Sequence, residues 1–257
     1  MTASVVEPPH LVANLKTLCL VNAVKQWRRL AEAAVKLRQP HPEYLDELVG
    51  IEVQTRRENR IQRRIKDAHF PILKTFDSFD FKAQPSLDRE AILDLLRCEF
   101  VDTHSNVVLV GGVGTGKTHL AISLAIACCQ REKRVRFTTA AELTNVFVEA
   151  KKDGRLSRKL EQLARYDVVV IDELGYVPFD KVGADLLFGF ISKVYERRSL
   201  IVTTNLPFAK WGEVFLDPTA AAAVIDRVVH HAVVLKTDGD SYRLRAAKRG
   251  RKEAKEG

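Results

Sequence analysis

The sequence predicts an α/β fold with a parallel sheet, because three apolar segments each run into polar residues. Residues 106–110 read Asn-Val-Val-Leu-Val, residues 167–171 read Asp-Val-Val-Val-Ile, and residues 199–204 read Ser-Leu-Ile-Val-Thr-Thr. Segments that are apolar on both faces are typical of strands buried between two layers of helices. With 257 residues, 46% of them hydrophobic, the chain is long enough to bury such a core.

A phosphate-binding loop follows the first of these strands. Residues 111–118 read Gly-Gly-Val-Gly-Thr-Gly-Lys-Thr and match the pattern G-x-x-x-x-G-K-[ST]. In that pattern the backbone N–H groups surround the phosphates, Lys117 reaches the β- and γ-phosphates, and Thr118 offers its hydroxyl to Mg²⁺. The apolar run 119–128 predicts a helix whose N-terminal dipole faces the anion. A glycine-rich turn of purely structural use would need neither the lysine nor the threonine. The predicted nucleotide-binding residues are Gly111, Gly112, Val113, Gly114, Thr115, Gly116, Lys117, Thr118 and His119.

Two carboxylates end the second apolar segment. Asp172 and Glu173 follow Ile171 at the edge where a parallel sheet presents its ligand-binding residues. We expect Asp172 to hold Mg²⁺ with Thr118, and Glu173 to orient and deprotonate the attacking water. The alternative is an ordinary Asp-Glu pair on the surface. Together with the phosphate loop, the pair predicts an enzyme that hydrolyses a nucleotide with Mg²⁺.

The third apolar segment predicts a further polar residue at the same edge. Asn205 would lie beside the γ-phosphate if residues 199–204 form a strand between the other two. About fifty residues separate the loop from Asp172, which leaves room for another strand at 134–137 and its helix. Asn205 has a simpler alternative role, which is to cap the turn at Leu206-Pro207.

The charge of the chain predicts a polyanionic partner. The formal net charge is +8, and basic residues gather at 56–64, at 151–159 and in the tail after residue 243. Within the first cluster the side chains could instead form i,i+4 pairs with Glu52, Glu58 and Asp67 on an ordinary solvated helix. The predicted DNA-binding residues are Arg56, Arg57, Arg60, Arg63, Arg64, Lys151, Lys152 and Arg155.

The first part of the chain predicts a separate helical domain over residues 1–69 that binds DNA, a protein partner or both. Leucines and Trp27 repeat at three- and four-residue spacing, which places Trp27 in a core more readily than at a binding surface. Residues 70–245 are the expected nucleotide-binding domain, and 246–257 a basic, disordered tail. The absence of a signal sequence, a membrane-spanning segment or a disulfide pattern predicts a cytoplasmic protein with four reduced, buried cysteines.

Several motifs together resemble one known family. They are residues 75–81 (TFDSFDF), the loop through His119-Leu120, 171–176 (IDELGY), 195–198 (YERR), 203–207 (TTNLP), 211–213 (WGE), 225–227 (IDR) and 240–243 (DSYR). The chain resembles the IstB-type helper ATPases of bacterial insertion sequences, which are AAA+ proteins of the initiator and helicase-loader group. The resemblance covers almost the whole chain and implies an AAA+ core with a five-stranded parallel sheet. The ATPase motifs taken singly are shared with DnaC-type helicase loaders, and the run 172–211 is more discriminating.

The resemblance also implies roles for residues outside the phosphate loop. Arg227 matches the arginine finger that would reach the γ-phosphate of a neighbouring subunit, with Arg197 and Arg198 as second candidates at that interface. A simple ion pair with a nearby carboxylate is the alternative for Arg227. The helical insertion of the group matches residues 140–166 and would carry Lys151, Lys152 and Arg155 to the DNA backbone. Residues 76–81 would cover the adenine or, alternatively, pack in the core.

One departure from the group concerns the C-terminal region. The chain is expected to lack a helical lid domain, because few residues follow Arg243, so Arg243 is not assigned as the lid-borne arginine sensor.

The resemblance implies an ATP-dependent regulator of transposition that oligomerises on double-stranded target DNA. It would recruit or stimulate a partner transposase, with ATP at subunit interfaces and hydrolysis controlling disassembly. The alternative is a DnaC-like loader of a replicative helicase, which would prefer single strands. A third hypothesis is a scaffold that binds ATP without turning it over.

Overall fold

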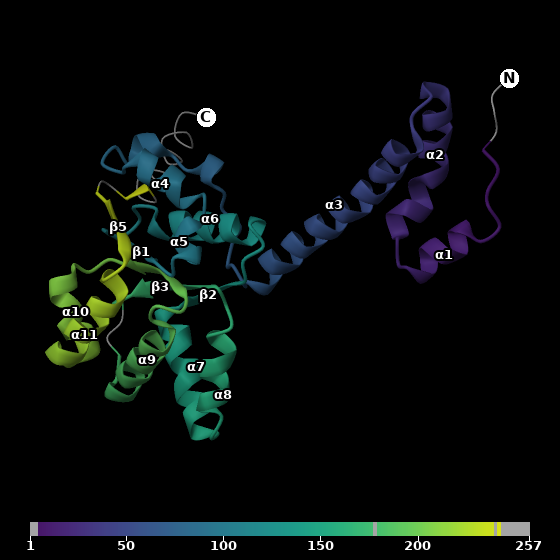
Figure 1. The fold of residues 1–257 in the computed structure, drawn as a ribbon. Coiled ribbons are helices and arrows are strands. Elements are labelled where there is room, and N and C mark those ends of the chain that lie inside the picture. Colours follow the sequence, from purple (N-terminus) through teal and green to yellow (C-terminus); the bar gives the residue numbers. More distant parts are fainter. Residues whose placement is uncertain (1–4, 177–178, 239–240, 243–257) are drawn as a thin grey trace, which may run out of the picture. The chain divides into compact units, whose positions relative to one another are not determined.

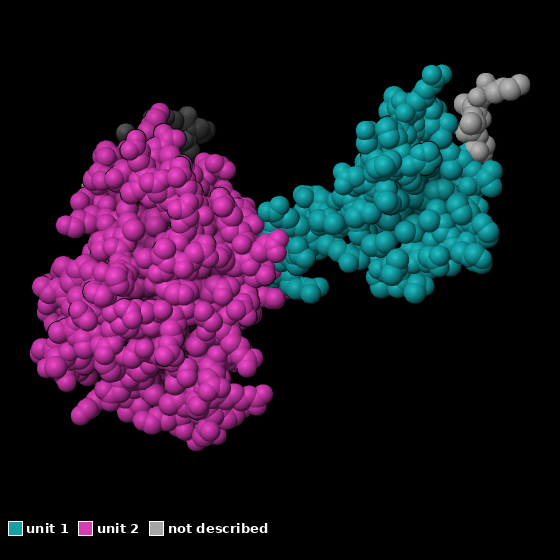
Figure 2. Space-filling model, viewed as in Figure 1, with its two compact units in different colours: residues 1–63 teal, residues 64–257 magenta. Residues whose placement is uncertain are grey.

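The computed structural model describes residues 5–176, 179–238 and 241–242. The chain divides into two compact units, residues 1–63 and residues 64–257 (Figure 2). The division falls within one long helix, α3 (His41–Asp67), a little before the proline at residue 71 where the sequence suggested a boundary.

The first unit is helical and has its own small core. Helices α1 (Leu11–Thr17) and α2 (Val21–Leu37) pack with the first part of α3. Trp27 lies in this core, only 4% exposed, beside Leu15, Leu30 and Leu48. The apolar spacing of the sequence predicted this position, because residues three and four apart share one face of a helix.

The second unit is built on a parallel sheet of five strands in the order β2-β3-β4-β1-β5. All four strand pairings are parallel, which confirms the predicted fold class. Strand β4 lies between β1 and β3, which is the condition under which the sequence placed Asn205 beside the γ-phosphate, so the ends of these three strands meet at one edge. The strands are β1 (Asn106–Gly111), β2 (Val135–Thr139), β3 (Val168–Leu174), β4 (Ser199–Thr204) and β5 (Ala232–Thr237).

Helices cover both faces of the sheet and give it two cores (Figure 1). One core contains helices α4 (Arg89–Leu95), α5 (Glu99–Asp102) and α6 (Lys117–Gln130). The other contains α7 (Ala140–Lys152), α8 (Leu156–Leu163), α9 (Lys181–Val194), α10 (Trp211–Phe215) and α11 (Pro218–Val229). Short 3₁₀ turns occur at Phe76–Ser78, Phe81–Ala83 and Phe208–Lys210. Because both faces of the sheet are covered, its strands are apolar throughout.

Local sequence signals fix where the helices begin. Helix α7 begins at a capping box in which the Thr139 hydroxyl accepts the N–H of Glu142 and the Glu142 carboxylate accepts the N–H of Thr139. Helix α11 begins with Pro218 after Asp217, whose carboxylate accepts two backbone N–H groups. Such caps each stabilise a helix by about 1 kcal/mol.

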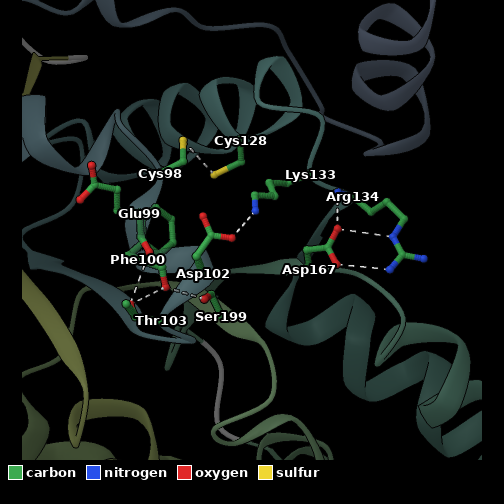
Figure 3. Close-up of polar contacts among 10 residues, drawn as sticks. All are labelled: Cys98, Glu99, Phe100, Asp102, Thr103, Cys128, Lys133, Arg134, Asp167 and Ser199. Atoms are coloured by element: carbon green, nitrogen blue, oxygen red, sulfur yellow. Dashed lines mark hydrogen bonds and ion pairs between the residues drawn. The ribbon is translucent and has the colours of Figure 1, made fainter.

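Polar contacts tie the strands together near their N-terminal ends (Figure 3). Asp167 accepts the N–H of Arg134 at 2.8 Å and its guanidinium Nη2 at 3.2 Å. Burial raises the pKa of Asp167, but the hydrogen bonds and charge of Arg134 outweigh that effect and leave the pKa below its usual value. On β4, the Ser199 hydroxyl donates to the Phe100 carbonyl oxygen at 3.1 Å. These contacts hold the sheet at the edge opposite the phosphate loop.

All four cysteines are free thiols. Cys98, Cys128 and Cys129 are buried, and the Cys98 and Cys128 sulfurs lie 3.5 Å apart (Figure 3). Burial raises the pKa of Cys129 to about 12, which makes that thiol a poor nucleophile. The prediction that all four cysteines are buried is wrong for Cys19, which is exposed near the end of α1.

Candidate nucleotide-binding site

A pocket of about 440 Å³ opens at the carboxyl ends of β1, β3 and β4. Its floor is the loop between β1 and α6, one wall comes from the ends of β3 and β4, and another from residues 72–84. Pockets of this volume hold ligands the size of a nucleotide, and this edge of a parallel sheet is where α/β proteins bind them.

The loop has the backbone conformation that its glycines permit. Gly114 and Gly116 have φ values of +80° and +93°, which side-chain-bearing residues rarely adopt. A Cβ atom at Gly116 would lie 2.8 Å from the Phe79 ring. The Lys117 ammonium lies over the loop and donates to the carbonyl oxygens of Gly111 at 2.8 Å and Gly112 at 2.6 Å. The lysine charge is therefore held where the loop's N–H groups can bind phosphate.

A second group of contacts joins the start of α6 to the ends of β3 and β4. The Thr118 hydroxyl donates to the Asp172 carboxylate, with distances of 3.0 and 3.1 Å to its two oxygens. Asp172 is only 4% exposed. A hydroxyl and a carboxylate oxygen are the ligand types that Mg²⁺ prefers, so this donor set fits the ion expected with a nucleoside triphosphate.

Thr203 completes this arrangement and was not identified as a site residue from the sequence. Its buried hydroxyl donates to Asp172 Oδ1 at 2.5 Å and accepts the Glu173 N–H at 2.9 Å. One side chain on β4 thus fixes both acidic residues at the end of β3. The available signal was its place in the Thr-Thr-Asn sequence at the end of a strand parallel to β3.

We expect the Thr203→Val variant to lose about 1–3 kcal/mol of the free energy of unfolding. Valine has nearly the same shape but leaves the Glu173 N–H and one Asp172 oxygen without this buried partner. Urea unfolding followed by circular dichroism measures the change. Thr203→Ser keeps the hydroxyl and serves as the control. Equal stability of the valine variant and the native chain would contradict the structural role of this hydroxyl.

Glu173 has an unusual backbone conformation. Its φ is +59°, in the left-handed region, and the β3–β4 pairing is irregular between Ile171 and Leu174. This conformation costs a non-glycine residue about 1 kcal/mol and often marks a functional position. Glu173 is exposed and lines the pocket.

Asn205 also lines the pocket. The turn after β4 is held by Thr204, whose hydroxyl accepts the Leu206 N–H at 3.1 Å. Within the described part of the chain, the buried Asn205 Oδ1 has no hydrogen-bond partner. Thr204 thus makes the turn-capping contact that was the alternative role for Asn205. The Asn205 amide oxygen can therefore still accept a hydrogen bond from a ligand or water.

The aromatic segment before the loop has two functions in the fold. Phe76 and Phe81 pack edge-to-face at 5.1 Å between ring centroids and belong to the core that includes α6. Phe79 also packs there, and it lines the pocket. His119 Nε2 lies 3.0 Å from the Thr75 carbonyl oxygen and so fastens this segment to the start of α6. All three rings thus pack in the core, and of the three only Phe79 also lines the pocket, so contact of the segment with adenine stays a prediction.

Comparison with known proteins places this geometry in a family. The family model of the IstB-like ATP binding proteins matches residues 13–250. The chain belongs to this family. Insertion sequence IS232 putative ATP-binding protein from Bacillus thuringiensis subsp. berliner is 37% identical over 92% of this chain and 94% of its own length. The IS5376 putative ATP-binding protein of Geobacillus stearothermophilus is 38% identical over 86% of this chain and 88% of its own.

Solved structures agree on the fold of this IstB-like chain. The DnaC helicase loader superposes with a TM-score of 0.50 and 19% identity, covering 58% of this chain and 90% of its own. A DNA replication initiation factor superposes with a TM-score of 0.55 and 20% identity, covering 70% of this chain and 54% of its own. The family resemblance and the AAA+ fold predicted from the sequence are both confirmed.

The arginines considered for a subunit interface do not line the pocket of their own chain. On α11, Arg227 donates to the Ala223 carbonyl oxygen at 2.9 Å and lies over the Phe188 ring at 5.0 Å. Arg198 donates to the Ala164 carbonyl oxygen, while Arg197 is exposed. Arg243 lies outside the described residues. The nearby Tyr242 N–H donates to the Gly114 carbonyl oxygen at 3.0 Å, so the segment after β5 touches the phosphate loop.

The basic residues of α3 are largely exposed, but they are not all unpaired. Arg56 Nε donates to the buried Glu52 at 3.0 Å, which is the i,i+4 pair that the sequence offered as an alternative. Arg57 and Arg60 also have interactions of their own. Arg63 is the last residue of the first unit, and the half-buried Arg64 is the first of the second.

The second basic cluster lies where α7 ends and α8 begins. Lys151 and Lys152 are exposed in the last turn of α7, and Arg155 precedes α8, where it pairs with Asp153. Arg155, Arg158 and Lys159 line a shallow groove between these two helices. The basic tail of the sequence lies outside the described residues, and no described helix is long and apolar enough to cross a membrane.

Proposed function

We propose that the chain is an ATP-dependent regulator of transposition that oligomerises on double-stranded target DNA and recruits or stimulates a partner transposase. ATP hydrolysis would control its disassembly, in the cytoplasm. The observation that carries the enzymatic part is the contact of Thr118 and Thr203 with Asp172, beside the exposed Glu173. Family membership and relatives named as insertion-sequence ATP-binding proteins support the connection with transposition.

The phosphate loop and the polar residues at the ends of β3 and β4 each have a defined part in this proposal. The loop N–H groups and Lys117 bind the phosphates, and Thr118 and Asp172 hold Mg²⁺, which when bound neutralises phosphate charge. Glu173 accepts a proton from the attacking water, and Asn205 orients that water or the γ-phosphate through its amide. With these roles, the hydrolysis rate depends mainly on the positioning of the reacting groups and on the stabilisation of charge, as is general for phosphoryl transfer.

Arg227 contributes in trans. Arg227 lies on α11 and does not line the nucleotide pocket of its own chain. We place its guanidinium at the γ-phosphate bound by a neighbouring chain. A positive charge at that position stabilises the transition state, which makes hydrolysis depend on assembly. The same dependence links ATP turnover to the DNA on which the chains gather.

The turnover of ATP tests the enzymatic proposal directly. We expect phosphate release by the native chain to rise when duplex DNA, and then the transposase, are added to saturation. A rate that stays at background under both conditions would support the scaffold hypothesis. Competition between duplex and single-stranded DNA tests the substrate class, since a preference for single strands would support the helicase-loader alternative.

We expect neutralisation of Lys151, Lys152 and Arg155 to weaken duplex binding mainly through its salt dependence. The slope of log K against log salt is negative, and each phosphate contact contributes about 0.9 to its magnitude. If each side chain contacts one phosphate, replacing all three by alanine therefore makes the slope shallower by about 2.7. Fluorescence anisotropy at several salt concentrations measures the slope. The triple variant of exposed Arg97, Lys181 and Lys210 removes the same charge from the same unit and is the control. Equal slopes for the two variants would contradict the DNA contact.

A further inference from the structure

Gln84 is the buried polar side chain of the pocket that the proposed chemistry does not use. It follows the 3₁₀ turn Phe81–Ala83, lines the pocket, and is only 3% exposed. Its backbone groups are satisfied, because its N–H donates to the Phe81 carbonyl oxygen and its own carbonyl oxygen accepts the Leu87 N–H. Within the described residues, neither Nε2 nor Oε1 of the side chain has a hydrogen-bond partner.

This lack of partners is energetically unfavourable and points to a ligand. A buried amide has lost its hydrogen bonds to water, and the protein does not replace them here. The unsatisfied groups are the acceptor and the donor of one amide, so a molecule with a donor beside an acceptor would satisfy both. The amide breaks no hydrogen bond when it turns toward such a molecule, and the terminal torsion of glutamine is soft.

The position of Gln84 assigns it to the base rather than to the phosphates. Gln84 belongs to the lining segment 72–84, whereas the phosphate loop and the ends of β3 and β4 contribute the residues assigned to the phosphates. The lining also includes Ile72, Phe79, Ala83 and Ile122, apolar residues that suit a flat ring. Two other polar side chains of this wall are already engaged: Ser78 donates to the Thr75 carbonyl oxygen and Asp80 accepts the Lys82 N–H.

We propose that Gln84 recognises the adenine base, with Oε1 accepting from the 6-amino group and Nε2 donating to N7. Glutamine makes this two-bond pairing with adenine elsewhere in protein recognition. The proposal rests on ATP binding at the same pocket and adds the residue that selects the base. Guanine has an oxygen in place of the 6-amino group, and its ring-nitrogen edge at that side offers two acceptors, which one amide cannot satisfy together.

The test compares two ligands that differ only at the base. Titration calorimetry measures binding of ATP and of purine ribonucleoside triphosphate, which lacks the 6-amino group. We expect the native chain to bind ATP roughly ten- to hundredfold more tightly than the analogue. The Gln84→Leu variant should lose most of that difference, and Gln84→Asn, whose amide is one methylene shorter, should fall between them. Inorganic tripolyphosphate, which has no base, should bind the native and leucine chains equally.

Thermal unfolding without nucleotide separates recognition from folding. Leucine removes a buried amide that has no partner, so the melting temperature of Gln84→Leu should match or exceed that of the native chain. A clear fall in that temperature, or equal losses of ATP and tripolyphosphate affinity, would indicate a structural role and overturn the proposal. Absence of ATP binding to the native chain would overturn the proposed function as well. Normal ATP binding that is unchanged in Gln84→Leu would overturn this inference alone.

Discussion

The Glu173→Gln variant is expected to bind ATP as tightly as the native chain and to hydrolyse it about a thousandfold more slowly. Glutamine preserves the size of the side chain and its hydrogen bonding to water, but it cannot take the proton. The left-handed backbone at this position and the Glu173 N–H bond to Thr203 are unaffected by the change. Single-turnover release of labelled phosphate measures the hydrolysis step separately from binding.

The same variant should accumulate on duplex DNA in the presence of ATP, because the step that dismantles the assembly is blocked. Glu90→Gln, at an exposed position in the first turn of α4, is the matched control and should behave as the native chain. Rapid release of Glu173→Gln from DNA, or hydrolysis within tenfold of the native rate, would remove Glu173 from the proposed role of base.

Replacing Lys117 by alanine should lower ATP affinity by at least about a hundredfold. The ammonium lies over the loop, within hydrogen-bond distance of the Gly111 and Gly112 carbonyl oxygens, and a charged donor there binds phosphate oxygens strongly. Titration with a fluorescent ATP analogue measures the affinity. The result should hold with or without DNA, because the phosphate loop is complete within one chain.

Lys82→Ala is the control for the loss of a positive charge. Lys82 is exposed on the 3₁₀ turn Phe81–Ala83, near the pocket in sequence but not part of its lining. We expect the affinity of the Lys82→Ala variant for ATP to stay within about twofold of the native value, since an exposed charge outside the pocket is screened by salt. Equal losses in the two variants would show that the pocket responds to net charge rather than to the Lys117 contact.

The fold could be predicted from the sequence because its signals are local and repeated. Val168–Leu174 and Ser199–Thr204 are apolar on both faces, which only strands buried between two helical layers require. The length of chain between the phosphate loop and Asp172 predicted the additional strand β2, whereas the place of β4 between β1 and β3 was only a condition for the role of Asn205. The polar ends of these strands then met at one edge, as the parallel arrangement demands.

Other features of the site depend on contacts between distant residues and have no local signal. Thr203 resembles an ordinary strand residue, because threonine is common in strands, and its contact with Asp172 joins two strands 31 residues apart. Gln84 is polar and follows a turn, so its burial could not be read from its neighbours in sequence. The positive φ of Glu173 is imposed by the irregular pairing of β3 with β4.

The roles of individual residues in binding and catalysis stay predictions. Exposed arginines such as Arg57 and Arg60 have partners within the chain, so their charge alone does not define a DNA surface. The role of Arg227 is likewise a prediction, since the γ-phosphate that it is proposed to contact would be bound to another chain.

Imaging of the assemblies that form on duplex DNA tests the central claim most directly. Negative-stain electron microscopy of the native chain and Glu173→Gln, each with ATP or with ADP, would show the size of the complexes. We expect large regular assemblies on duplex DNA with ATP, persistent in Glu173→Gln and absent with ADP. Assemblies that form equally with ADP, or that form on single strands and not on duplex DNA, would contradict an ATP-controlled assembly on target DNA.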